Sequence, residues 1–243
     1  MTELQALRDA YRQHKAALLA SLQAQGASTR GIHVLLRKFS RLADGLLTTL
    51  WQRAGLPPGL TLAAVGGFGR EQLFPHSDID VLVLLPTDLP APDTVREQVE
   101  AFIRSCWDAG LEIGSSVRSV EECLSEAAND VTVQTSLLEA RRVCGDAALF
   151  ARFEHQFGAQ LDPHAFLVAK TLEMRQRHTK HENTPYALEP NCKESPGGLR
   201  DLHLILWVAR AAGLGKRWDE LAHSGLATPY EVRQIQRNEA LLF

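Results

Sequence analysis

The run VGGFGREQLFPHSDIDVLVLL constrains the fold of this chain more than any other segment. Residues 61–65 and residues 80–85 are short apolar runs rich in β-branched side chains, and the connection between them is tight. Three glycines lie in that connection: Gly66, Gly67 and Gly69. Two apolar strands joined in this way, the second almost wholly apolar, predict the buried centre of a β-sheet.

Helical patterns surround this pair of strands. Apolar residues recur at steps of three and four over residues 32–53 and 93–109, and residues 1–25 carry a looser stripe of the same kind. Residues 111–117 predict a third strand, and from residue 130 onward we expect helices alone. These patterns predict an α+β fold with a small mixed sheet and flanking helices.

Helix-capping and helix-breaking residues indicate where the segments of the chain begin and end. We expect an amino-terminal helical segment over residues 1–55, a core over 56–130 and a helical domain over 131–243. The last helix ends on apolar residues, so we expect it to continue in a longer protein. Residues 178–200 form a long polar stretch with three prolines, and a loop of that length is more often functional than idle. Helix starts are predicted at Ser119 (with Glu122), Asp130, Asp162 and Thr228 (with Glu231).

Two aspartates lie at the start of the second apolar strand. Asp78 and Asp80 are two residues apart, so the period of a strand directs both to one face. Carboxylate oxygens are the ligands that Mg²⁺ takes together with substrate phosphates. Taken alone, the pair also fits a solvated strand end, but an unpaired charge directly before an apolar strand is costly.

The glycine turn before these carboxylates is suited to a phosphate chain. Gly66 and Gly67 allow close approach of the backbone, and Arg70 adds a charged donor nearby. A glycine pair alone indicates no more than a tight turn. The combination of the turn with Asp78 and Asp80 favours a site for a metal-bound nucleotide.

Composition excludes several other classes. The formal net charge is -3, which does not suit a strongly basic nucleic-acid-binding protein, although a local basic groove is compatible with it. The four cysteines form no Cys-x-x-Cys pair, which favours reduced thiols in a cytoplasmic protein.

His178 and His181 lack a further ligand pattern, so we expect solvated histidines near a helix end rather than zinc ligands. With no apolar run near the roughly 18 residues of a spanning helix and no secretory signal, we expect neither membrane nor nucleic-acid partners.

Three blocks carry a resemblance to a known family. The first is GG-x-G-R-x-x-L-x-P-x-S-D-I-D, the second EPNCKESPGGLRDLHLILWVAR from Glu189, and the third LEIGSSVRSVEEC from Leu111. They resemble the polymerase-β-like nucleotidyltransferases and, more specifically, the bacterial PII uridylyltransferase/uridylyl-removing family. One position departs from that pattern, because Ser115 stands where the family has histidine.

The resemblance implies a polymerase-β-like nucleotidyltransferase fold and a reaction. UMP would pass from UTP to a tyrosine hydroxyl of the signal protein PII, pyrophosphate would leave, and two Mg²⁺ ions would assist, with Mn²⁺ as a substitute. It also implies a third carboxylate on the third strand. Glu112 holds that place, with Asp108 as a weaker competitor. Asp78, Asp80 and Glu112 would then be both catalytic residues and metal ligands.

The second block leaves two interpretations open. Lys193 and Arg200 lie in a basic, glycine-containing loop before a helix, which suits a nucleotide. The same loop also suits a structural turn in which Arg200 and Asp201 stabilise the helix start. The resemblance favours the nucleotide, with Gly66, Gly67, Arg70 and Ser77 as the other contacts. The site would lie in a cleft under the loop 178–200.

Three other functions compete with this prediction. A related adenylyltransferase acting on glutamine synthetase, or on another protein, would carry a similar S-D-I-D block. A polynucleotide-directed transferase of the same superfamily is disfavoured by the acidic net charge. A catalytically silent, regulatory nucleotide-binding module is disfavoured by the presence of both Asp78 and Asp80.

Overall fold

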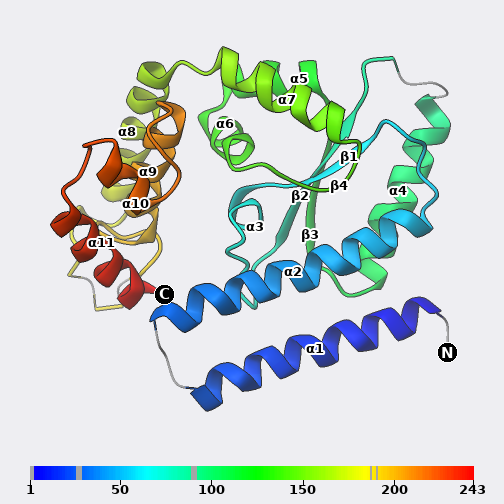
Figure 1. The fold of residues 1–243 in the computed structure, drawn as a ribbon, viewed down its shortest axis with the longest axis horizontal. Coiled ribbons are helices and arrows are strands. Elements are labelled where there is room, and N and C mark those ends of the chain that lie inside the picture. Colours follow the sequence, from blue (N-terminus) through cyan, green and yellow to red (C-terminus); the bar gives the residue numbers. More distant parts are fainter. Residues whose placement is uncertain (1–2, 26–28, 89–91, 187, 190) are drawn as a thin grey trace. The chain divides into compact units, whose positions relative to one another are not determined.

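A computed structural model describes residues 3–25, 29–88, 92–186, 188–189 and 191–243 (Figure 1). The chain divides into two compact units, an N-terminal unit of residues 1–157 and a C-terminal unit of residues 158–243. The finer division expected at residues 55 and 130 stays a prediction. No helix in the described ranges combines the length and the apolar composition that crossing a bilayer requires.

The N-terminal unit is built on one mixed sheet with the strand order β3-β2-β1-β4. Strand β1 is antiparallel to both β2 and β4, whereas β2 and β3 are parallel. The strands are β1 (Thr61–Ala64), β2 (Ile79–Leu85), β3 (Ile113–Ser119) and β4 (Arg141–Gly145). The predicted α+β class with a small mixed sheet is therefore confirmed, and the strand pair predicted around the glycine turn forms the centre of the sheet.

Seven helices of the described chain accompany this sheet: α1 (Glu3–Gln25), α2 (Thr29–Arg53), α3 (Gly66–Gly69), α4 (Pro92–Asp108), α5 (Val120–Asn129), α6 (Val131–Leu138) and α7 (Ala147–Gln160). Helix α1 packs along α2, and α2 contacts α4 and β4 (Figure 1). The predicted helix starts are confirmed, because Ser119 and Glu122 form a capping box and the Asp130 carboxylate accepts from two backbone N–H groups.

The expectation of helices alone beyond residue 130 is wrong, because β4 lies there. Its sequence, RRVCG, holds a single β-branched residue and two arginines, so no apolar run marks it as a strand. Its pairing with β1 shifts register between Leu62 and Ala63. Gly145 has a φ of 88°, and a side chain there would overlap the backbone of Leu60. Tertiary pairing, not local propensity, makes this segment a strand.

One face of the sheet forms the main core with α2 and α4. Val81 and Val83 of β2 join the same buried cluster as Leu47 of α2 and Phe102 of α4. Side chains alternate across a strand, so residues of β2 with even numbers point to the opposite face. Asp80 therefore projects away from this core.

In its described residues, the C-terminal unit contains four helices: α8 (Pro163–Lys180), α9 (Leu199–Ala211), α10 (Trp218–His223) and α11 (Pro229–Leu242). Asp162 caps α8, and Thr228 forms a capping box with Glu231 at the start of α11, as predicted. Trp218 and Leu221 of α10 are buried in a small cluster with Val232 of α11. The irregular segment between α8 and α9 spans residues 181–198, slightly less than expected.

Candidate active site

The three predicted carboxylates lie at the starts of two neighbouring parallel strands. In the β2–β3 register Ile79 pairs with Ile113 and Asp80 with Gly114. The backbone N–H of Ile79 donates to the carbonyl oxygen of Glu112 at 2.8 Å, which extends the pairing by one step toward the strand starts. Parallel strands begin at the same edge of a sheet, so Asp78 and Glu112 come to one edge.

Alternation places these carboxylates on one face. Leu111 and Ile113, on either side of Glu112, are buried in the main core, whereas Glu112 is exposed. Asp78 and Asp80 are exposed as well, with Ile79 buried between them. Asp78, Asp80 and Glu112 thus share the sheet face opposite to α2 and α4, as the strand period predicts.

Two glycines make room for the Asp80 carboxylate. A Cβ atom added to Gly114 would lie 2.6 Å from Asp80 Oδ1, and one added to Gly66 would lie 3.6 Å from Asp80 Oδ2. The carboxylate therefore lies across the bare backbone of β3 and beside the glycine turn. Ser136 of α6 borders the same space, with its Oγ 4.0 Å from the added Gly66 atom. The sequence alone did not single out Gly114 or Ser136.

The carboxylates are not drawn together into a metal-binding cluster. Within the described residues, no three His, Cys, Asp or Glu side chains are grouped so that they could hold a metal ion. Asp78 and Glu112 take part in no side-chain hydrogen bond or ion pair with the rest of the described chain. Their oxygens are of the kind that Mg²⁺ prefers, and their exposure leaves them accessible to one. Metal binding by these residues stays a prediction.

The glycine turn folds as the short helix α3, directly after β1. Gly66 has a φ of 56°, a conformation that side chains other than glycine rarely adopt. The N–H of Val65 donates to the carbonyl oxygen of Asp80 at 3.0 Å, which ties the turn to the start of β2. Gly66 and Gly67 are therefore held next to Asp80, where the sequence predicts the phosphates to lie.

Arg70, predicted to contact phosphate, is ion-paired within the protein. Its Nη1 contacts the carboxylate of Glu139, and its Nε donates to Gln72 Oε1 at 3.0 Å. Glu139 is 3% exposed. Sequence reasoning missed Glu139, because nothing in the neighbouring sequence marks it as a buried, paired carboxylate.

A second ion pair, between Arg141 and Asp44, lies close to α3. Arg141 of β4 donates to both carboxylate oxygens of Asp44 in α2 at 3.0 Å, and its guanidinium lies 5.4 Å from the centre of the Phe68 ring. Burial raises the pKa of the Asp44 carboxyl above its ordinary value, and the Arg141 hydrogen bond only partly opposes this. Phe68 is itself almost completely buried. The turn is thus fixed by packing and by charge.

Ser77 occupies an exposed turn just before Asp78. Its backbone N–H donates to the carbonyl oxygen of Phe74 at 3.1 Å. A cavity of about 60 Å³ lies next to this turn, lined in part by Ser77, Glu112 and the Lys15 side chain of α1. Ligand pockets usually have volumes of about 300 Å³ or more. This cavity alone does not accommodate a nucleotide.

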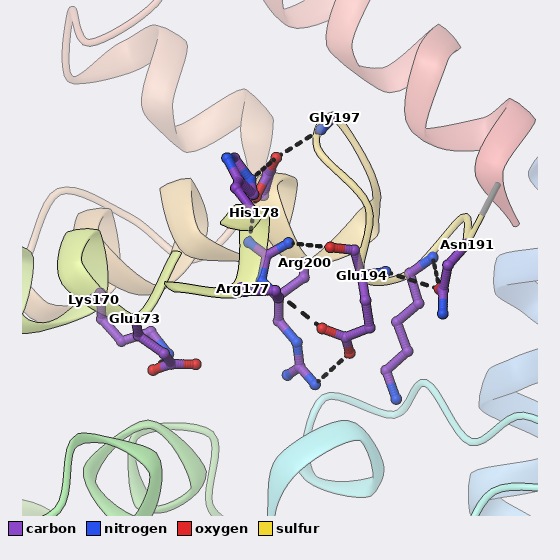
Figure 2. A network of polar contacts seen from close by, with 10 residues as sticks. Lys170, Glu173, Arg177, His178, Asn191, Glu194, Gly197 and Arg200 are labelled. Atoms are coloured by element: carbon purple, nitrogen blue, oxygen red, sulfur yellow. Dashed lines mark hydrogen bonds and ion pairs between the residues drawn. The ribbon is translucent and has the colours of Figure 1, made fainter. Parts of the chain in front are cut away.

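The second sequence block belongs to the C-terminal unit, where Glu194, Arg200 and Asp201 take part in a network of polar contacts (Figure 2). Asp201, in the first turn of α9, accepts from the N–H of Gly197 at 2.7 Å and also binds Arg177 and His178. Arg200 donates to Glu194 Oε1 at 3.1 Å. These contacts support the structural interpretation for Arg200 and Asp201.

His178 corrects one expectation. It is half-buried, and its Nε2 lies 3.0 Å from both carboxylate oxygens of Asp201, so it is not a solvated histidine. Burial by itself raises the pKa of the Asp201 carboxyl, but the bonds from Arg177, Gly197 and His178 together hold that pKa below its ordinary value.

Lys193 differs from its neighbours, because its side chain is exposed and takes no ion pair or hydrogen bond in the described chain. Its backbone is engaged, because the N–H donates to Asn191 Oδ1 at 3.0 Å and the carbonyl oxygen accepts from the N–H of Arg200 at 3.0 Å. The predicted nucleotide contacts of Lys193 and Arg200 stay predictions.

Two family comparisons match separate parts of the chain. The family described as "Nucleotidyltransferase domain" matches residues 47–140, and the family described as "GlnD PII-uridylyltransferase" matches residues 165–243. The first match contains Gly66, Asp78, Asp80 and Glu112. The second contains Lys193, Arg200 and the network of Figure 2.

Whole-protein comparisons agree with these matches. A protein of Burkholderia mallei (strain ATCC 23344), named "Bifunctional uridylyltransferase/uridylyl-removing enzyme", is 57% identical over 226 residues. The aligned part is 93% of this chain and 26% of that protein. A protein of the same name from Burkholderia pseudomallei (strain K96243) gives the same identity and coverage. The chain thus spans about a quarter of the length of the curated relatives it matches.

Proposed function

Because this chain belongs to the family of the bifunctional uridylyltransferase/uridylyl-removing enzymes, we propose that it carries their uridylyl-transfer site. The reaction would move UMP from UTP to a tyrosine hydroxyl of the signal protein PII and release pyrophosphate. The observation that carries this proposal is the placement of Asp78, Asp80 and Glu112 on one sheet face beside the Gly66–Gly67 turn. Hard oxygen donors next to a glycine turn are suited to a metal-bound triphosphate.

The residues would divide the work as follows. Asp78, Asp80 and Glu112 would hold the magnesium ions, and Mn²⁺ could replace Mg²⁺ in their place. When bound, the metal supplies Lewis-acid stabilisation of phosphate charge and a lowered pKa for the attacking hydroxyl. The Gly66–Gly67 turn and Arg70 would orient the triphosphate, and Ser77, Lys193 and Arg200 would add contacts to the nucleotide.

Nucleotide titration tests this proposal directly. UTP, ATP and CTP are each titrated calorimetrically into the protein with Mg²⁺, and the UTP series is repeated with Asp80→Asn. We expect UTP to bind most tightly and Asp80→Asn to weaken the Mg²⁺-dependent binding by at least about tenfold, or roughly 1.4 kcal/mol. Asp9→Asn is the matched control, because Asp9 is exposed on α1 and the substitution removes the same charge.

Other outcomes point to the competing functions. A preference for ATP would favour an adenylyltransferase acting on glutamine synthetase or another protein. Absence of nucleotide binding would favour a catalytically silent module. Equal binding by Asp80→Asn and the wild type would remove Asp80 from the site.

A further inference from the structure

Glu139 is a buried acidic residue that the uridylyl-transfer reaction as described above does not use. It follows the last residue of α6, and 3% of its side chain is exposed. Burying a carboxylate costs free energy, and the ion pair with Arg70 offsets part of that cost. Arg70 is more exposed, at 21%, and follows the last residue of α3.

The contacts of Arg70 fix the direction of its guanidinium group. Glu139 binds Nη1, and Gln72 accepts from Nε at 3.0 Å. A guanidinium is planar, so two partners on different nitrogens define the orientation of the whole group. Nη2 lies 3.7 Å from the position that a Cβ atom on Gly67 would occupy. The third nitrogen is thereby turned toward the glycine turn.

The backbone of Glu139 contacts the same turn. A side chain on Gly69 would overlap the carbonyl oxygen of Glu139, so the two backbones are packed without space between them. Residue 139 is therefore anchored to α3 by its main chain and to Arg70 by its carboxylate. This arrangement is more than charge compensation, because it fixes one end of the Glu139–Arg70 pair to the turn itself.

We propose that Glu139 is a positioning residue that orients Arg70 toward the triphosphate of the bound nucleotide. The inference rests on the proposed function, because it assumes that a nucleotide lies at the Gly66–Gly67 turn. It adds the residue that follows α6 to the proposed site. Its contribution would be the direction of the Arg70 donor, since the pair as a whole carries no net charge.

If Glu139 positions Arg70, removing Glu139 should change the affinity for UTP in the direction opposite to that expected from charge alone. Removing a negative charge near a triphosphate should strengthen binding if charge alone mattered. If Glu139 positions Arg70, its removal should weaken binding instead. We expect Glu139→Ala to raise the Kd for UTP with Mg²⁺ about tenfold, in the range of a lost charge-assisted hydrogen bond. Glu139→Gln retains an oxygen acceptor for Arg70 and should recover most of the affinity.

A double-mutant cycle tests whether Glu139 acts through Arg70. Affinities for UTP are measured by calorimetry at fixed salt for the wild type, Arg70→Ala, Glu139→Ala and the double variant. We expect the double variant to match Arg70→Ala within about twofold, because Glu139 has nothing to position once Arg70 is gone. Leu47→Ala controls for lost stability alone, since Leu47 is completely buried in the core and distant from Glu139 in sequence. It should lower the melting temperature without changing the Kd.

The outcomes separate this inference from the proposed function. If the wild type binds no UTP with Mg²⁺, the proposed function fails. If the wild type binds and Glu139→Ala binds equally well or more tightly, the positioning role is refuted and the proposed function stands. If Glu139→Ala does not fold, the variant Arg70→Lys tests the positioning role instead. The ammonium group of lysine cannot contact Glu139 and the glycine turn at once. Wild-type affinity in Arg70→Lys would then refute the role, and a loss of about tenfold would support it.

Discussion

The substitution Gly114→Ala should lower the proposed transferase activity without lowering the free energy of unfolding. Gly114 lies on β3 beneath the Asp80 carboxylate, and an added Cβ atom would be 2.6 Å from Asp80 Oδ1. Ordinary van der Waals contact starts at 3.4 Å, so the oxygen would have to move by roughly 0.8 Å. The displaced atom is the end of a side chain, which can rotate away without moving the backbone.

The two expected changes have opposite directions. Alanine is favoured over glycine in a strand by roughly 0.5–1 kcal/mol, so the free energy of unfolding should stay equal or rise. A misplacement of about 1 Å at a reacting centre can cost up to about 100-fold in rate. Under the proposed function, we therefore expect UMP transfer to PII to fall by about 10- to 100-fold, with unchanged or improved resistance to urea.

A matched variant and a second background make this test specific. Gly45→Ala is the control, because Gly45 is exposed in the middle of α2 and an added Cβ atom meets nothing within 4 Å. It should raise the stability by up to about 1 kcal/mol and leave transfer unchanged. In an Asp80→Ala background, Gly114→Ala should have no further effect on UTP binding. Full transfer activity in Gly114→Ala alone would refute the argument that the observed Asp80 position is the working one.

Two further predictions concern stability. Gly69→Ala should destabilise the N-terminal unit by at least about 2 kcal/mol, because the added atom overlaps backbone that cannot rotate away, whereas Gly67→Ala, with neighbours at 3.7 Å, should be nearly neutral in urea denaturation. Asp201→Asn should destabilise the C-terminal unit at pH 7. The lowered pKa of Asp201 gives a stabilisation that is present above the unfolded-state pKa of about 3.9 and is lost as the pH falls through the folded-state pKa. The difference between Asp201→Asn and wild type in urea midpoint should therefore shrink below about pH 4, and a constant difference would contradict the assignment.

The sequence predicted the part of the fold whose signals are local. The glycine turn and the apolar run after Asp80 specify β1, β2 and the tight connection between them, because turn geometry and strand period are set by neighbouring residues. Helix caps such as Ser119 with Glu122 were predictable for the same reason. The shared face of Asp78 and Asp80 also followed from alternation, whereas Glu112 was implied by the resemblance.

The parts that sequence reasoning missed depend on distant residues. Strand β4 exists because its backbone pairs with β1, about 80 residues earlier in the chain. Glu139 pairs with Arg70 across 69 positions, and Arg141 with Asp44 across 97. No local pattern encodes such partners, since a charged residue reads as a surface residue until its partner is known. His178 was misjudged in the same way.

The charged residues of the three resembling blocks have different surroundings in the structure. In the C-terminal unit, Arg200 pairs with Glu194 of the preceding loop and Asp201 with Arg177 of α8, so both residues already have a structural role. At the start of β2 and β3, the Asp78 and Glu112 side chains form no ion pair or hydrogen bond in the described chain. Like charges gathered on one sheet face without partners bring folding no gain. The proposed role in binding a cation would account for Asp78 and Glu112, which is why the uridylyl-transfer proposal depends on the first and third blocks more than on the second.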